Sequence, residues 1–269
     1  EDLGEPLFVS RSSKIYKWED NILLKLFNEN IDPELIKNEQ INTTETYKKG
    51  VSMVKCLGQV DIGTQKGLLL LRVGGETLIS LAGSKPVTAF GVPKLMAKLQ
   101  EEIHGTGTEI IRSYKDMVID ALSSEPLSFL TFEEKQKAIN HIELLPDGNS
   151  ILHLDYHPDN IMSDGEAATI IDWMTAASGC PAADVAATLY LLREGEMIPG
   201  LNRAVALVLE VIRKMICSKY YAAYKADTGL TDEEVKPWRL PFLIVRLGVW
   251  NIETEVKILQ KKIREELKE

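Results

Sequence analysis

The feature that most constrains the fold is a change of pattern at Gly74–Gly75. Before it, the chain consists mainly of short alternating or apolar segments that predict strands. After it, long helical patterns such as VPKLMAKLQEEIH and FEEKQKAINHIELL fill residues 91–145, and helices return from about Asp184 to the end. There is no internal repeat and no low-complexity linker. The sequence therefore predicts an α+β fold with two lobes, 1–73 and 74–269, that share a hinge and a cleft.

The first lobe is predicted in the order βββαββ. Three antiparallel strands fit the segments EPLFVS, KIYKW and NILLKLF. A helix follows, because Asp32 is placed as an N-cap, Pro33 stands at the first helical position and Gly50 can stop the helix. Two more strands, in VKCLGQVDIG and KGLLLLRV, are expected to join through a turn that uses Gly63 and Gly67.

Composition indicates an ordinary folded protein and disfavours some partners. Of the 269 residues, 45% are hydrophobic and 26% are charged, which argues against a disordered chain. The formal net charge of -9 argues against nucleic acid as the principal partner, because binding to a phosphate backbone needs clustered Lys and Arg. No run approaches the roughly 18 uninterrupted apolar residues of a membrane span, and the start shows no targeting segment, so no membrane is expected.

The cysteines favour a reducing compartment. Cys56, Cys180 and Cys217 are widely separated and odd in number, which favours free thiols over a disulfide framework. We therefore expect a cytoplasmic protein, either a monomer or a homodimer. The NTT sequence at Asn42 matches a glycosylation sequon, but in a cytoplasmic protein this match has no meaning.

The stretch LHLDYHPDNIM contains the residues that predict the chemistry. His153, Asp155 and Asn160 form the pattern H-x-D-x-x-x-x-N, and Asp172 follows in the apolar segment ATIIDW. Phosphoryl transfer from a nucleotide needs an aspartate to orient or deprotonate the attacking hydroxyl, and oxygen ligands that hold Mg²⁺ on the phosphates. Asp155 is the right type of residue for the first task, and Asn160 and Asp172 are right for the second. A loop that turns at Pro158 can present these groups to one cavity.

Two other functions fit parts of the same stretch. In a metal-dependent hydrolase, His153, Asp155 and His157 would share one face of a regular strand and bind a transition metal. Pro158 and the need for a loop disfavour that geometry, and otherwise we expect His157 to pack without a chemical role. The other alternative is a non-catalytic nucleotide-binding scaffold, which is disfavoured because every residue type that the reaction needs is present.

The first lobe supplies an independent test of phosphoryl transfer. Such a site needs a cation for the α- and β-phosphates on the third strand and a carboxylate on the following helix to position it. Lys25 lies among aliphatic residues in NILLKLF, and Glu39 in LIKNEQ is its expected partner, with Glu45 as the alternative. Lysine is also common as a protective residue on edge strands, and Glu39 could be one more charge on an exposed helix face.

Taken together, these motifs resemble the aminoglycoside phosphotransferase and choline kinase-like family, the small-molecule branch of the protein kinase-like fold. The resemblance covers nearly the whole chain, and its motifs are LLKLF, LIKNEQ, LLLLRVGGETL, LHLDYHPDNIM, IIDW and SGCPAADVAATL. It implies ATP or GTP with Mg²⁺ as cofactors, Lys25 on the nucleotide phosphates, Asn160 and Asp172 as metal ligands, and Asp155 as the catalytic residue.

The resemblance also implies roles for residues around this core. It implies that His153 and Asp184 support the catalytic loop, and that His104 is structural. The hinge would bind adenine through the backbone of Arg72, Val73 and Gly74.

Three positions depart from the family pattern. Leu154 stands where the family often has Gly, and Leu71 stands where a glutamate is common before the hinge. The turn expected to cover the phosphates, SRSSK, has no glycine, so anchoring there would use Ser12, Ser13 and backbone amides.

The acceptor is expected to be a hydroxyl of a small molecule: an aminoglycoside, a choline-like amine or a sugar. From Asp155 to Glu196 acidic residues heavily outnumber basic ones, with Arg193 the lone cation, and such a field would attract an amine. Binding of Mg²⁺ is an equally good reason for this negative charge. A protein substrate is disfavoured, because no A-P-E segment follows Asp172.

Overall fold

The computed structural model describes residues 3–195 and 202–268, which form two compact units. Unit 1 contains the chain up to Ala89 together with Pro158–Ala176, and unit 2 contains Phe90–His157 and the chain from Ala177 onward. The lobe boundaries expected from the sequence divide the chain differently and stay a prediction. Each unit is described by itself below.

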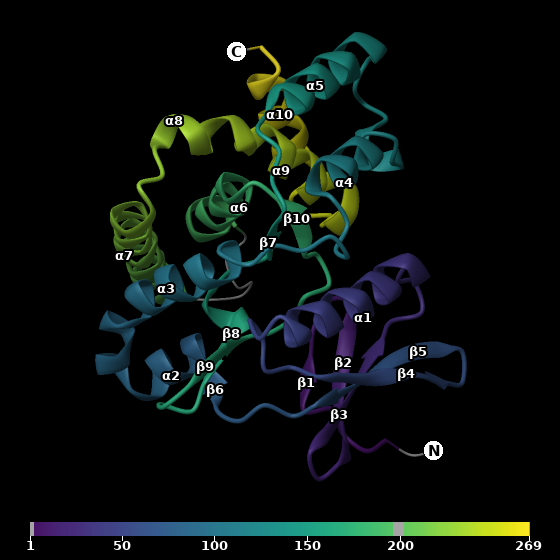
Figure 1. The fold of residues 1–269 in the computed structure, drawn as a ribbon, viewed down its shortest axis with the longest axis vertical. Coiled ribbons are helices and arrows are strands. Elements are labelled where there is room, and N and C mark those ends of the chain that lie inside the picture. Colours follow the sequence, from purple (N-terminus) through teal and green to yellow (C-terminus); the bar gives the residue numbers. More distant parts are fainter. Residues whose placement is uncertain (1–2, 196–201, 269) are drawn as a thin grey trace. The chain divides into compact units, whose positions relative to one another are not determined.

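Unit 1 is built on an antiparallel five-stranded sheet. Its order is β1-β2-β3-β5-β4 (Figure 1). Its strands are β1 (Phe8–Val9), β2 (Ser13–Glu19), β3 (Ile22–Phe27), β4 (Cys56–Ile62) and β5 (Gln65–Leu71). The strand predictions for this region are confirmed. Strand β3 is central. Its side chains Leu24 and Phe27 are fully buried because they pack into two separate core clusters, Leu24 with Tyr16 and Phe27 with Ile36.

Helix α1 (Pro33–Lys48) begins and ends as predicted. The Asp32 side chain accepts a hydrogen bond from the Glu34 N–H at 2.9 Å, and Gly50 follows the helix with a φ of 76°. The prediction for Gly67 was wrong. It lies inside β5, where an added Cβ would come within 2.6 Å of Leu24 Cδ1, so the glycine makes room for the core.

The remainder of unit 1 is a second, small sheet with short helices. The sheet has the order β6-β8-β9, and its strands are β6 (Glu76–Thr77), β8 (Ile161–Ser163) and β9 (Ala168–Ile170). The helices are α2 (Leu78–Ser84), η1 (Pro86–Phe90), which runs to the border with unit 2, and η3 (Pro158–Asn160). Gly75, with a φ of 94°, lies so close to Ser163 that a Cβ would meet its carbonyl oxygen at 2.2 Å. A side chain is therefore excluded where β6 approaches β8.

Unit 2 is mainly helical. Its helices are α3 (Val92–His104), α4 (Tyr114–Ala121), η2 (Glu125–Leu127), α5 (Phe132–Leu144), α6 (Pro181–Glu194), α7 (Arg203–Thr228), α8 (Asp232–Val235), η4 (Lys236–Trp238), α9 (Arg239–Val245), the π-helical turn η5 (Arg246–Trp250) and α10 (Val256–Glu266). Strands β7 (Ser150–Leu152) and β10 (Ala177–Gly179) pair antiparallel. The two long helices predicted between residues 91 and 145 are confirmed as α3 and α5, whereas α4 and β10 had no distinct signal.

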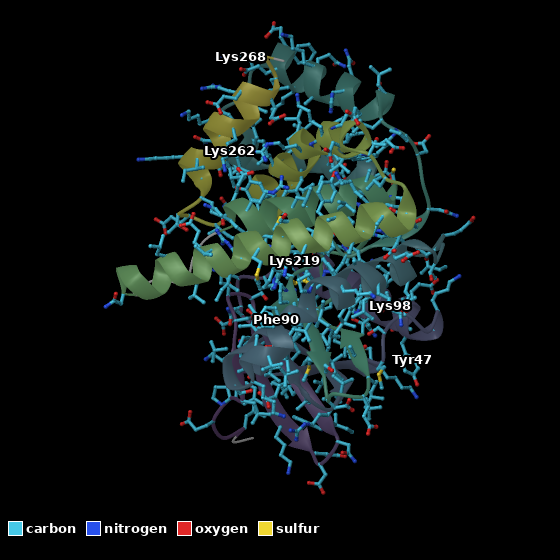
Figure 2. The ribbon with its side chains drawn as sticks, turned by 90° about the vertical axis from the view of Figure 1, so that its left-hand side faces the viewer. Tyr47, Phe90, Lys98, Lys219, Lys262 and Lys268 are labelled. Carbon is cyan, nitrogen blue, oxygen red and sulfur yellow. The ribbon has the colours of Figure 1, made fainter. Side chains whose placement is uncertain are left out.

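Helices α3, α6 and α7 pack side by side in unit 2 (Figure 1). Small residues of α6, such as Ala183 and Ala187, are fully buried, which lets the neighbouring helices approach. Figure 2 shows Lys219 of α7 beside Phe90, and its amine lies 5.8 Å from the centre of that ring. Within the described ranges, no helix is both long enough and apolar enough to cross a membrane.

Candidate active site

Lys25 is the centre of a buried ion cluster in unit 1. It lies on β3 opposite Ile15 of β2, and only 4% of the residue is exposed. Its Nζ donates hydrogen bonds to Glu39 Oε1 at 2.6 Å and to Asp172 Oδ1 at 2.8 Å. Burial opposes the charge of Lys25, but the two carboxylates outweigh this effect and raise its pKa above the ordinary value. The cluster therefore holds a charged amine in a fixed place.

Glu39, and not Glu45, forms the ion pair with this lysine. Glu39 is 1% exposed, whereas Glu45 lies 3.9 Å from the amine of Lys49 on the same helix. Burial raises the pKa of Glu39, the charge of Asp172 adds to this effect, and Lys25 opposes it. Glu39 Oε2 has no hydrogen-bond partner among the described residues. The position of the Glu39 carboxylate thus depends on Lys25.

Asn160 and Asp172 meet at one end of the β8–β9 hairpin. Asn160 precedes β8 directly, and Asp172 follows β9 by two residues. The Ile171 N–H donates to the Asn160 carbonyl at 2.9 Å, which fixes the two segments side by side. Asp172 has a φ of 63°, a left-handed conformation that few residues other than glycine adopt. Backbone strain of this kind concentrates at functional sites, where surrounding contacts maintain it.

One residue that holds this hairpin was not found from the sequence. Asn42 of α1 donates through Nδ2 to the carbonyls of Trp173 and Ala176, at 2.9 and 3.1 Å. Asn42 is 3% exposed, so the NTT sequence belongs to a buried contact and not to the surface. The available signal was its position three residues after Glu39, which places both polar side chains on the same face of α1.

The predicted hinge residues follow β5 directly. The N–H of Arg72 donates to the Asn21 carbonyl at 2.8 Å, so this amide already has a partner. Arg72 and Gly74 are exposed and Val73 is half-buried. Recognition of adenine at this place would therefore use backbone groups of Val73 and Gly74 and the Arg72 carbonyl.

Serines close the turn between β1 and β2. The N–H of Ser13 donates to Ser10 Oγ at 3.1 Å, and the Ser12 carbonyl accepts the Asn28 N–H at 2.9 Å. Asn28 Nδ2 also donates to the Arg11 carbonyl at 2.7 Å. These bonds fix a turn that lacks glycine. Ser13 is 1% exposed, so its hydroxyl supports the turn and Ser12 is the more accessible of the two predicted phosphate anchors.

In unit 2, Asp155 has a histidine directly beside its carboxylate. His157 Nε2 lies 3.7 Å from Asp155 Oδ2, and the Asp155 side chain is 24% exposed. Burial disfavours the charged carboxylate, but His157, with smaller contributions from His153 and Arg246, lowers the pKa of Asp155 to about 2. The sequence predicted no chemical role for His157, yet the structure places it against the predicted catalytic residue.

Asp184 ties this loop to the first turn of α6. Its carboxylate is fully buried and accepts the N–H groups of His153 at 3.1 Å and Leu154 at 2.6 Å. It also contacts Gln100 Nε2 and His104 Nε2, both at 3.0 Å. Burial opposes its charge, but these hydrogen bonds, led by that of His104, lower the pKa of Asp184. An ionised carboxylate therefore holds the backbone immediately before Asp155.

His153 and Leu154 are shaped by this arrangement. The Asp155 N–H points at His153 Nδ1 over 3.3 Å, so this nitrogen accepts and the ring supports the loop backbone. Leu154 has a φ of 62° and is completely buried. The left-handed backbone at this position favours glycine.

Comparison with known proteins identifies the family of the chain. The sequence profile of the phosphotransferase enzyme family matches residues 23–211. The chain belongs to this phosphotransferase family. A search of curated proteins finds no match.

Solved structures of other phosphotransferases share the fold. A thermostable mutant of the aminoglycoside phosphotransferase APH(4)-Ia aligns with a TM-score of 0.65 at 14% identity, over 98% of this chain and 93% of the other. The choline kinase LicA from Streptococcus pneumoniae aligns with a TM-score of 0.58 at 15% identity, over 99% and 92%. The expected α+β protein kinase-like fold is thus confirmed, with an antiparallel sheet and helix in its N-terminal part and a helical C-terminal part.

The donor groups at the hairpin fit a magnesium ion. Asn160 offers an amide oxygen and Asp172 a carboxylate, and Mg²⁺ prefers such hard oxygen ligands. The Asp172 side chain is 36% exposed, and only its Oδ1 pairs with Lys25, so Oδ2 is suited to an ion. Across the described ranges, no three His, Cys, Asp or Glu side chains form a metal cluster, so the geometry gives the hydrolase built on His153, Asp155 and His157 no support.

Proposed function

We propose that the chain is a magnesium-dependent phosphotransferase that moves the γ-phosphate of ATP or GTP to a hydroxyl group of a small molecule. The family match supports phosphotransferase chemistry in general. The observation that carries the proposal for this chain is the cluster in which the Lys25 amine joins Glu39 and Asp172. A scaffold protein has no need for this buried lysine beside a strained, half-exposed aspartate, because burying unneeded charges is costly.

Unit 1 would bind the nucleotide. Lys25 would contact the α- and β-phosphates, and Mg²⁺, held by Asn160 and Asp172, would neutralise charge on the phosphates. The adenine or guanine ring would lie against the backbone of Arg72, Val73 and Gly74. A ternary complex of the APH(4)-Ia mutant with AMP-PNP and hygromycin B supports this proposal, because that protein binds a nucleotide analogue and a small molecule together.

Asp155 would orient the acceptor hydroxyl. A carboxylate with a pKa of about 2 is ionised at any working pH and accepts a hydrogen bond from the hydroxyl. It is a weak base, so it would take the proton late, once the bond to phosphorus is largely formed. That timing suits the loose transition state of phosphoryl transfer, which gains little from early deprotonation.

Two of the acidic residues counted in the sequence are already engaged within the protein and give no preference for an amine acceptor. Glu194 is paired with Arg239 at 2.8 Å and with Lys262 at 2.7 Å, and Asp184 is buried under the catalytic loop. Glu196 lies outside the described residues. The proposal therefore covers a small-molecule hydroxyl in general, which includes aminoglycosides, choline-like amines and sugars.

A nucleotide-consumption screen tests this function. Purified chain with ATP or GTP and Mg²⁺ would be offered a panel of hydroxyl-bearing metabolites and aminoglycosides, with the Asp155→Asn variant as the blank. We expect at least one acceptor to give consumption that needs both Mg²⁺ and Asp155, with a phosphorylated product visible by mass spectrometry. Nucleotide binding without consumption over the whole panel would instead support the scaffold alternative.

A further inference from the structure

Unit 2 contains a pocket whose lining includes none of the residues proposed for catalysis, nucleotide binding or metal binding. Its volume is about 450 Å³, and it lies where the end of α3, the start of α6 and the end of α7 approach one another. Cys180, Pro181 and Leu230 form much of its apolar wall. Tyr224 and His104 also line it, and both are buried, with 2% and 8% exposed. The pocket therefore combines an apolar wall with two buried polar side chains.

A chain of hydrogen bonds connects these two side chains to the catalytic loop. The hydroxyl of Tyr224 lies 2.6 Å from His104 Nδ1, and His104 Nε2 lies 3.0 Å from Asp184 Oδ2. Asp184 in turn accepts the backbone N–H of Leu154, the residue before Asp155. Three successive contacts thus lead from the pocket to the backbone that positions the predicted catalytic carboxylate.

The direction of these hydrogen bonds defines what the pocket can bind. The ionised carboxylate of Asp184 can only accept, so His104 Nε2 carries the proton and, in the neutral ring, Nδ1 accepts. With the ring in that neutral form, Tyr224 donates its hydroxyl proton to Nδ1. Its oxygen keeps lone pairs that can accept a hydrogen bond from a ligand in the pocket. A ligand that fits this pocket would therefore present a hydrogen-bond donor to the Tyr224 hydroxyl oxygen.

The two carboxylates that line the pocket favour a positive donor. Glu101 and Glu234 both line it, and no lysine or arginine does among its lining residues in the described chain. Glu234 also caps α8, where its Oε2 accepts the Thr231 N–H at 2.9 Å, so its position is fixed. A protonated amine combines positive charge with N–H donors, and hydrogen bonds to charged groups are stronger than neutral ones.

We propose that this pocket is an effector site for a small organic amine with a compact apolar body, acting on the catalytic loop through Tyr224, His104 and Asp184. The binding step does not depend on the proposed function, because it needs neither nucleotide nor acceptor. Only the consequence for turnover rests on phosphotransfer. The two proposals can therefore fail separately.

Binding is tested with 2-phenylethylamine, using 2-phenylethanol and phenylacetate as its neutral and anionic counterparts. Cys180 is partly exposed in the pocket wall, so N-ethylmaleimide labelling of this thiol, resolved by peptide mass spectrometry, reports occupancy. We expect the amine to slow labelling of Cys180 at least about fivefold while Cys56 labels as before. Equal protection by the three compounds, or protection by none, would overturn the proposal.

Two matched variants locate the amine. Glu101→Gln removes the charge on the pocket wall and should weaken amine binding about tenfold. Glu102→Gln is the control, because Glu102 is the next residue on α3 but pairs with Lys98 at 3.7 Å and does not line the pocket. If the two variants bound the amine with equal affinity, the amine would not lie beside Glu101 in this pocket.

Hydrogen exchange tests the connection to the loop without any assay of phosphotransfer. We expect the amine to change amide exchange in the peptide that contains His153 and Leu154, whose N–H groups bond to Asp184. Tyr224→Phe keeps the ring but removes the hydroxyl, so in this variant that change should disappear. A response that persists in Tyr224→Phe would show that the coupling does not pass through Tyr224.

Discussion

Two residues of the site, Leu154 and Asp172, keep left-handed backbone without being glycine. Each such conformation costs roughly 1–2 kcal/mol and persists only where other contacts maintain it. At Leu154 the compensation is visible, because its N–H is bonded to the buried Asp184 and its side chain is completely buried. At Asp172 the side chain is held by the ion pair with Lys25.

At this scale His157 is predicted to keep the Asp155 carboxylate ionised at low pH. In His157→Gln the pKa of Asp155 should rise from about 2 towards its ordinary value of 3.8. As pH is lowered, a carboxylate with a higher pKa is protonated sooner and can then no longer accept the hydrogen bond from the substrate hydroxyl. The acid limb of the kcat/KM profile should therefore move to higher pH. The control is His141→Gln, whose ring contacts the Pro237 carbonyl. Identical profiles for the wild type and His157→Gln would show that His157 does not control this carboxylate.

Lys25 is predicted to affect both stability and nucleotide binding. Lys25→Met leaves Glu39 buried without its partner, which should lower the free energy of unfolding by about 3 kcal/mol and weaken nucleotide binding at least tenfold. Lys17→Met, which breaks the exposed pair with Asp20, should leave the free energy of unfolding close to that of the wild type. Urea denaturation and calorimetric titration with nucleotide measure the two effects. Unchanged nucleotide affinity in Lys25→Met would contradict the phosphate contact.

At the scale of elements, α1 holds the hairpin that supplies Asn160 and Asp172. Asn42→Ala leaves the buried carbonyls of Trp173 and Ala176 without their donor, which should cost about 2 kcal/mol of stability. It should also raise KM for the magnesium–nucleotide complex. Thr44→Ala is the control on the same helix, because its hydroxyl bonds to the Gln40 carbonyl within α1 and not to the hairpin carbonyls that Asn42 holds. If both variants had the same KM, the hairpin would not depend on Asn42.

Much of this arrangement could be predicted from local pattern. The cap at Asp32, the strand around Lys25 and the helix α3 follow from periodicity and capping, which act over a few residues. The role of His157 could not be predicted this way, because it depends on contacts that only the folded backbone makes. For Asn42 the local pattern gives its helix face, shared with Glu39, but not its carbonyl partners Trp173 and Ala176. Gly67 was misplaced for the same reason, since its small size serves packing against Leu24 and not a turn.

At the scale of the whole molecule, two partly buried carboxylates with lowered pKa values make stability depend on pH. Glu194, held by Arg239 and Lys262, has its pKa lowered to about 2 from 4.5, and that of Asp155 is also lowered to about 2. Groups with a lowered folded pKa stabilise the protein above their unfolded pKa, and this contribution is lost as pH falls towards the folded pKa. The free energy of unfolding should therefore decrease between about pH 5 and pH 2.

A variant separates this effect from general acid denaturation. In Glu194→Gln the decrease between pH 5 and pH 2 should be shallower than in the wild type, as measured by urea denaturation across that range. Glu133→Gln, an exposed first-turn position of α5, should keep the slope of the wild type. If Glu194→Gln had the same slope as the wild type, the ion pairs of Glu194 with Arg239 and Lys262 would not contribute to the pH dependence of stability.

The most direct test of the proposed chemistry compares transfer and binding in Asp155→Asn. With an acceptor from the screen, the rate of γ-phosphate transfer should fall about 10²- to 10⁴-fold, because the variant loses both orientation and proton acceptance. Nucleotide affinity should stay within about twofold, because Lys25, Asn160 and Asp172 are unchanged. Transfer at a rate near that of the wild type, with the same affinity, would contradict the assignment of Asp155 as the catalytic residue.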